Sequence, residues 1–447
     1  MKKINVGKIA DRFIPAFLRP YWDKRSDSPI GYRIAQGGFW SMMGTGVPQA
    51  LNLISSIVIA RLLGKVHLGE YSMILSTTGM FGIFTGIALA ITSTKFVAEF
   101  RKNDPAKAGR TIAFLSLLAL GIAVLMAGFL IIAAPWLAQR TLGAPHLVNL
   151  LRISAGIIFF GAINGIQMGS LAGFEAFRSI AWMNTLNGLI SFILLAGGAY
   201  FFGIPGVVLA LVVAGAFMCI ISSIELHSVA HRAGVQIDFT ECFNDLSILL
   251  NFSLPALLSG IISIPANWAC AAMLVNMQNG YAELGIYGAA NSWQKVIMFL
   301  PACLNSIALP MLSDFHGAKQ SRQFRKAFLY NMILIVISAL AVAVIVALAS
   351  SFIMRIYGTG FSSGRNVLII ISFTAVINAI DTFIGVNILA KGRMWFGVAS
   401  QSLWGALLLA IAYFLIPIYG AVGLCMAMLV AYLLQTIWQM LYITKVT

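Results

Sequence analysis

The stretch VPQALNLISSIVIARLLGKVHLGEY, from Val47 to Tyr71, contains an apolar helix, a charged exit and the start of a second apolar helix. Pro48 lies inside the first of these helices. About 217 residues further along the chain, Pro265 lies inside another apolar run, and the motif LGIY (284–287) begins the next run as LGEY (68–71) does here. This correspondence predicts that the chain is an internal duplication.

The composition indicates a polytopic membrane protein. Of the 447 residues, 60% are hydrophobic and 10% are charged, whereas soluble domains have about 25% charged residues. The net charge of +15 comes from basic residues in short segments between apolar runs, where they act as topology signals rather than as a nucleic-acid surface. The five cysteines lack paired spacing, so neither a disulfide framework nor a zinc site is expected.

A spanning helix needs about 20 apolar residues. Applied to this chain, that length predicts twelve spans, near 37–62, 70–94, 111–134, 148–171, 180–202, 206–229, 247–276, 285–310, 328–350, 366–389, 396–416 and 418–443. Lys and Arg are concentrated in the N-terminal tail and in the loops on the same side of the membrane. Both termini are therefore expected to be cytoplasmic.

We expect four segments: a basic cytoplasmic tail (1–33), a first six-helix lobe (34–232), a cytoplasmic linker (233–246) and a second six-helix lobe (247–447). The lobes also correspond outside the helices that begin them, since GIPGVVLALVVA (203–214) matches GAVGLCMAMLVA (420–431). An even number of spans in each lobe makes the repeats parallel, related by an axis along the membrane normal. The predicted fold is all-α, with two like lobes around a central cavity.

The sequence indicates a transporter rather than an enzyme. It contains no HExxH, GxSxG or Walker motif, and acidic residues are few. Pro48, Pro255 and Pro265 lie near glycines at similar depths in the first helix of each lobe, which predicts weakened helices that move or line a cavity. The alternative is a static packing kink.

Lys295 is the clearest candidate for substrate binding. It lies about ten residues inside a helix that begins near Gly285, which places it near the middle of the bilayer. A charge at that depth costs at least about 3 kcal/mol unless it is paired or lies in a wet cavity. Anion binding is one interpretation, and a structural ion pair with Asp381 is the other.

Asp381 lies deep in its predicted span and aligns with Asn164 in the first lobe. An intramembrane carboxylate is a candidate for binding a coupling proton or sodium ion, with Asn164 as its counterpart. The alternative for Asp381 is an inert partner for a lysine or for a helix end.

Three arginines near helix ends, Arg61, Arg152 and Arg365, are further candidates for receiving an anionic head group, because a guanidinium suits phosphate oxygens. The alternative for these arginines is snorkelling to the interface. Trp293, close to Lys295, is a candidate for stacking on a sugar, with simple packing as the alternative.

The segments ARLLGKVHLGEYSMILS (60–76), KFVAEFRKNDPAKAGR (95–110), GSLAGFEAFRSIAWMNTLNGL (169–189) and GIPGVVLALVVAG (203–215) resemble the Wzx-type polysaccharide flippases of the multidrug/oligosaccharidyl-lipid/polysaccharide exporter superfamily. The likeness covers nearly the whole chain from about Gly31. It implies MATE-like lobes around a cationic cavity that carry undecaprenyl-pyrophosphate-linked oligosaccharide across the bacterial inner membrane by alternating access. It also implies a pathway that makes O-antigen, capsule or exopolysaccharide, with Lys295 and then Arg61 as the cations for pyrophosphate.

Other interpretations stay open. Lipid II flippases of the same superfamily usually have more spans and several cavity arginines, and cation-coupled multidrug antiporters need a deep carboxylate, for which only Asp381 qualifies. A membrane scaffold that holds a polysaccharide polymerase and glycosyltransferases is the interpretation from another class. No cofactor or metal is expected apart from a coupling H⁺ or Na⁺.

Overall fold

The computed structural model describes residues 29–85, 87–239, 262–317, 320–390 and 394–446. Within these ranges the secondary structure is helical, without a strand. Most of the predicted tail, the end of the predicted linker and Pro255 lie outside the described residues. The four predicted segment boundaries therefore stay predictions.

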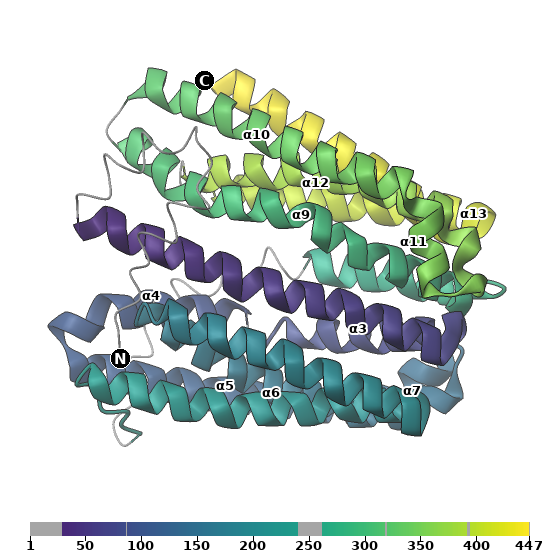
Figure 1. Ribbon diagram of the computed structural model, residues 1–447, viewed down its shortest axis with the longest axis horizontal. Coiled ribbons are helices and arrows are strands. Elements are labelled where there is room, and N and C mark those ends of the chain that lie inside the picture. Colours follow the sequence, from purple (N-terminus) through teal and green to yellow (C-terminus); the bar gives the residue numbers. More distant parts are fainter. Residues whose placement is uncertain (1–28, 86, 240–261, 318–319, 391–393, 447) are drawn as a thin grey trace.

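The two halves of the chain form two groups of helices on either side of α3 (Figure 1). The helices of the first half are α3 (Pro29–Gly82), α4 (Ile87–Asn103), α5 (Pro105–Trp136), η1 (Leu137–Thr141), η2 (Pro145–Leu147), α6 (Val148–Gly173) and α7 (Phe177–Arg232). The helices of the second half are Ile262–Val275, α9 (Gly280–Gly317), α10 (Ser321–Leu348), α11 (Ser350–Tyr357), η4 (Thr359–Gly364), α12 (Arg365–Ala390) and α13 (Met394–Val446).

Three long helices each join two predicted spans, although α3 includes only the first part of the span 70–94. α3, α7 and α13 bend at Gly64 (φ 77°), Gly203 (φ 63°) and Gly420 (φ 56°), conformations that glycine adopts readily. Among the described residues, seven helices are long and apolar enough to cross a membrane, whereas the sequence predicts twelve spans. The bends account for three of the five missing spans, and the other two correspond to the shorter helix Ile262–Val275 and to α9, which is not among the seven. The chain is a multi-pass membrane protein.

The bends confirm the duplication. Gly203 and Gly420 lie 217 residues apart, the spacing of the sequence repeat. Three residues after each bend, a Cβ on Gly206 or Gly423 would lie 2.2 Å from a carbonyl oxygen of the preceding helix. Glycine at these positions therefore lets the two spans of each hairpin pack tightly together.

The two lobes contact each other reciprocally through the LGEY and LGIY motifs. A Cβ on Gly69 would lie 1.8 Å from the carbonyl oxygen of Tyr281, and a Cβ on Gly285 would lie 1.9 Å from that of Lys65. Lys65 precedes Gly69 by four residues, as Tyr281 precedes Gly285. Such reciprocity is typical of a two-fold axis, so the repeats are related by a pseudo-two-fold axis at this contact.

The second predicted span, 70–94, is interrupted. α3 ends at Gly82 and α4 begins at Ile87, and the segment TTGMFGIFTG (77–86) supplies three glycines around the break. Glycine costs about 1 kcal/mol relative to alanine in a helix, so a run of three weakens this part of the span. The sequence prediction of one continuous helix here is wrong.

Candidate functional site

Hydrogen bonds join the two lobes at the end of the bundle that carries α11 and the bends at Gly64, Gly203 and Gly420, which we call the outer end. They are Arg61 Nε to Ile356 O (2.5 Å), Ser56 Oγ with Tyr357 Oη (3.1 Å), Asn276 Nδ2 to Thr141 O (2.7 Å) and Tyr281 Oη to Leu142 O (2.9 Å). Together with the Gly69–Gly285 contact, they hold the lobes together at the outer end.

A buried carboxylate lies beside this seam. Glu70 is 6% exposed, with Oε2 at 2.9 Å from His67 Nδ1 and Oε1 at 2.7 Å from His146 Nε2. Burial, and then the Glu70 charge, raise the pKa of Tyr281, which precedes the predicted span 285–310 in the other lobe. His67 and Glu70 are three residues apart, a spacing that predicts a contact within one helix. Nothing in the sequence indicates that His146 also contacts Glu70.

Lys295 and Arg61 lie at different depths. The Lys295 side chain is exposed, and its backbone carbonyl accepts a hydrogen bond from the Gln49 amide on α3. Gln49 precedes Arg61 by twelve residues, or about 18 Å along the helix. The two predicted pyrophosphate cations therefore form two successive positions rather than one shared site.

The two other predicted arginines lie on different helices from Lys295, whereas Trp293 lies two residues before it on α9. Arg365 is the first residue of α12 and Arg152 lies near the start of α6, both with exposed side chains. Trp293 is half-buried close to the Tyr357 hydroxyl. The roles of these three residues as substrate ligands stay predictions.

Asp381 is buried in the second lobe and interacts with one end of a polar cluster on α13. It is 5% exposed, its Oδ1 has no hydrogen-bond partner among the described residues, and its carboxylate interacts electrostatically with Tyr432. Tyr432, Gln435 and Gln439 lie on one face of α13, and both glutamine amides reach Ser400 Oγ, at 3.3 and 2.9 Å. The alternative ion pair between Asp381 and the exposed Lys295 is not formed, although the structure describes both side chains.

The first lobe lacks this cluster. Asn164, which lies 217 residues before Asp381, is half-buried and accepts a 3.4 Å hydrogen bond from Ser222. The positions equivalent to the serine and to the first glutamine of the cluster are the buried Met183 and Met218. A buried acid with a polar surround is thus a property of the second lobe.

The predicted kink residues pack closely. Pro48 lies within α3, where a Cβ on Gly188 of α7 would approach its Cα to 3.2 Å. Pro265 lies in the helix Ile262–Val275 and lines a cavity of about 520 Å³ between the lobes, together with Met80 and Gly405. A gating role for these prolines stays a prediction.

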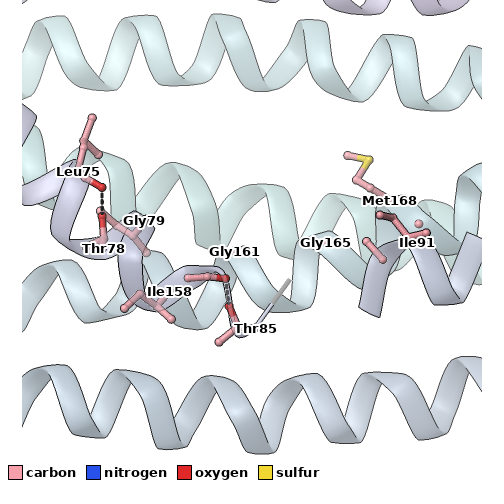
Figure 2. A pocket seen from close by; sticks show the side chains of 13 residues that line it. Leu75, Thr78, Gly79, Thr85, Ile91, Ile158, Gly161, Gly165 and Met168 are labelled. Atoms are coloured by element: carbon pink, nitrogen blue, oxygen red, sulfur yellow. Dashed lines mark hydrogen bonds between the residues drawn. The ribbon is translucent and has the colours of Figure 1, made fainter. Parts of the chain in front are cut away.

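A larger cavity of about 720 Å³ lies between α3, α4 and α6 (Figure 2). Its lining includes Leu75, Gly79, Ile91, Gly161 and Met168. None of the residues predicted from the sequence to bind substrate or ions lines it. Sequence reasoning missed this cavity because glycines and ordinary apolar residues form it.

Comparisons with known proteins identify the family and the fold. A family model described as polysaccharide biosynthesis protein matches residues 34–316. The EPS I polysaccharide export inner membrane protein EpsE of Ralstonia solanacearum is 26% identical over 204 residues, and the match spans 45% of that relative and 44% of this chain. The lipid III flippase of Escherichia coli (strain K12) is 22% identical over 405 residues, which cover 90% of this chain and 95% of that protein.

Solved structures show the same architecture. The inward-facing conformation of a multidrug resistance MATE family transporter of the MOP superfamily gives a TM-score of 0.72 at 13% identity, covering 91% of this chain and 98% of the other. The lipid II flippase MurJ in an inward closed conformation gives 0.70 at 13% identity, covering 90% and 87%. The predicted MATE-like fold is confirmed. Because the family model matches more than half of this chain, the chain belongs to the polysaccharide biosynthesis protein family.

Proposed function

We propose that this protein is a flippase that moves undecaprenyl-pyrophosphate-linked oligosaccharide from the cytoplasmic to the periplasmic leaflet of a bacterial inner membrane. Its product feeds the synthesis of O-antigen, capsule or exopolysaccharide. Family membership, the likeness to a lipid III flippase over 90% of the chain and the likeness to an inner membrane export protein support the proposal. The observation that carries it is the reciprocal contact of two like lobes at one end, since alternating access needs lobes that separate there.

In the predicted topology both termini are cytoplasmic and the outer end is periplasmic. The glycan and diphosphate enter from the cytoplasmic side and meet Lys295 at mid-depth. Separation of the lobes at the Gly69–Gly285 contact then breaks the hydrogen bond from Arg61 to Ile356 and frees this guanidinium, about 18 Å further out, for the diphosphate. The polyprenyl chain stays in apolar surroundings throughout, because its transfer to water is unfavourable.

We further propose that Asp381 couples the transport step to an H⁺ or Na⁺ gradient. A buried carboxylate oxygen without a hydrogen-bond partner among the described residues is costly as a bare charge, and a bound cation or proton relieves that cost. Transport driven by a pH gradient alone or by a sodium gradient alone in proteoliposomes distinguishes the two ions.

The experiment that tests the proposed function is the substitution Lys295→Ala in a strain whose own glycan flippase gene is deleted. Export of the cognate lipid-linked glycan is expected to fall sharply at an unchanged protein level, whereas Lys102→Ala, an exposed lysine at the end of α4, leaves export unchanged. If wild-type protein restores no export and flips no lipid-linked glycan in vesicles, the flippase proposal fails. A scaffold for polymerase and glycosyltransferases would instead support export without flipping in vesicles.

A further inference from the structure

The cavity between α3, α4 and α6 has the volume of a ligand pocket rather than of a packing defect. At about 720 Å³ it falls within the range of about 300–1,000 Å³ that is typical of small-molecule sites. Glycines on both sides create it, because a Cβ added at Gly79, Gly82 or Gly161 would meet nothing within 4 Å. Gly79, Gly161 and Ile91 are exposed and form its mouth (Figure 2).

The lining selects an apolar ligand. Glycines, aliphatic side chains and one methionine form most of the wall, and its two threonine hydroxyls already donate to backbone carbonyls. Thr78 Oγ1 donates to the carbonyl of Ile74 at 3.0 Å, and Thr85 Oγ1 donates to that of Gly82 at 2.8 Å. A sugar in this cavity would lose its hydrogen bonds to water without replacement, which is unfavourable. A hydrocarbon chain makes no hydrogen bonds to water and therefore loses none when it enters the cavity.

One end of the cavity is closed, and a lysine lies beyond it. Helices α4 and α6 pack tightly there, since a Cβ on Gly169 would lie 2.3 Å from the carbonyl oxygen of Ala90. Lys95 has an exposed side chain and follows Ile91 by one helical turn on the same face of α4. In the predicted topology this end faces the cytoplasm, so an apolar chamber in the inner half of the bilayer ends next to a cation.

We propose that this chamber, defined by Leu75, Gly79, Ile91, Gly161 and Met168, holds a stretch of the polyprenyl chain of the substrate, with Lys95 next to its diphosphate. The inference rests on the proposed flippase function and adds a site for the lipid part of the substrate in the first lobe. An isoprenoid diphosphate matches both features, because its tail is apolar and its head is anionic. Such a site retains the substrate at the cytoplasmic leaflet while the glycan enters between the lobes.

The test is photolabelling of the purified full-length protein in nanodiscs with a polyprenyl diphosphate that carries a diazirine on its tail. Crosslinks are expected in residues 75–91 and 157–169. Gly161→Leu, which narrows the mouth of the chamber, is expected to lower this labelling about tenfold. Gly121→Leu is the matched control, since Gly121 is exposed on α5 and its Cβ would also meet nothing within 4 Å. Undecaprenyl diphosphate should compete, and phosphatidylglycerol should not.

Two results would overturn the inference. Crosslinks outside these segments in the wild-type protein would place the tail elsewhere, and this readout needs no variant to fold. Equal competition by phosphatidylglycerol would make the chamber an ordinary acyl-chain site. Neither result contradicts the flippase function if the wild-type protein still restores glycan export. Conversely, crosslinks in the chamber without restored export would contradict the flippase function but not the polyprenyl site.

Discussion

The contact between Gly69 and Gly285 predicts that a single methyl group opens the outer end of the protein. In Gly285→Ala the new Cβ would lie 1.9 Å from the carbonyl oxygen of Lys65, whereas such contacts are essentially never shorter than 3.0 Å. The two helices must therefore separate by about 1 Å. The obstructing atoms are the carbonyl oxygen and carbon of Lys65, which belong to the backbone and adapt poorly. Overpacking of this kind costs about 1–3 kcal/mol, which shifts the equilibrium between closed and open outer ends by about 5- to 150-fold.

The assay is the reactivity of Ser72→Cys, in a background without the native cysteines, toward a membrane-impermeant maleimide added to spheroplasts. Ser72 packs on Gly288 across the same seam, so its labelling rate reports opening. Labelling is expected to rise at least about fivefold in Gly285→Ala. Gly121→Ala gains the same helix propensity without a new contact and should not change the rate. Unchanged labelling and unchanged export in Gly285→Ala would refute the idea that this contact closes the outer end.

Three further predictions concern other parts of the molecule. Glu70→Gln should lower the thermal unfolding midpoint only slightly and leave Ser72→Cys labelling unchanged, since His67, Glu70 and His146 all lie in the first lobe and pairs with exposed partners contribute about 0.2–1 kcal/mol. A rise in labelling would show that the cluster also affects closure of the seam. Asp381→Asn should raise the thermal unfolding midpoint, because it removes a buried charge. The same substitution should abolish the dependence of export on the ion gradient. Gradient-dependent export by this variant would exclude Asp381 as the coupling group. Gly420→Ala, at φ 56°, should lower the unfolding midpoint by the equivalent of about 1–2 kcal/mol, and Gly121→Ala should not; equal midpoints would show that the bend tolerates a side chain.

The membrane class and the duplication could be predicted from the sequence because both depend on signals carried by runs of residues. Hydropathy marks the spans, and the GIPG and GAVG segments contain the two bends at Gly203 and Gly420. The LGEY and LGIY motifs showed that the lobes are alike. That they face each other depends on a contact between residues more than 200 positions apart, which no local pattern encodes.

The candidate site was less accessible from the sequence. The depth of Lys295 follows from helix length, but its separation from Arg61 and the absence of an ion pair with Asp381 follow from tertiary packing. The cavity beside α3 exists because several of its lining residues are glycines, which have no side chain to fill the space. A hydropathy profile shows how apolar a segment is, but not where glycines from two helices leave a space between them. His146 joins Glu70 from a distant turn, so its role had no sequence signal.

The first turn of α9 is also tied to the far hairpin of its own lobe. Glu283, two residues before the Gly285 contact, accepts a 3.0 Å hydrogen bond from the backbone amide of Ala421, directly after the α13 bend. A shift of α9 at the seam must therefore either break this bond or pull the bend of α13 with it. In the second case the movement reaches the part of α13 that carries Tyr432, whose hydroxyl interacts with Asp381, so α9 and the buried acid are connected through α13.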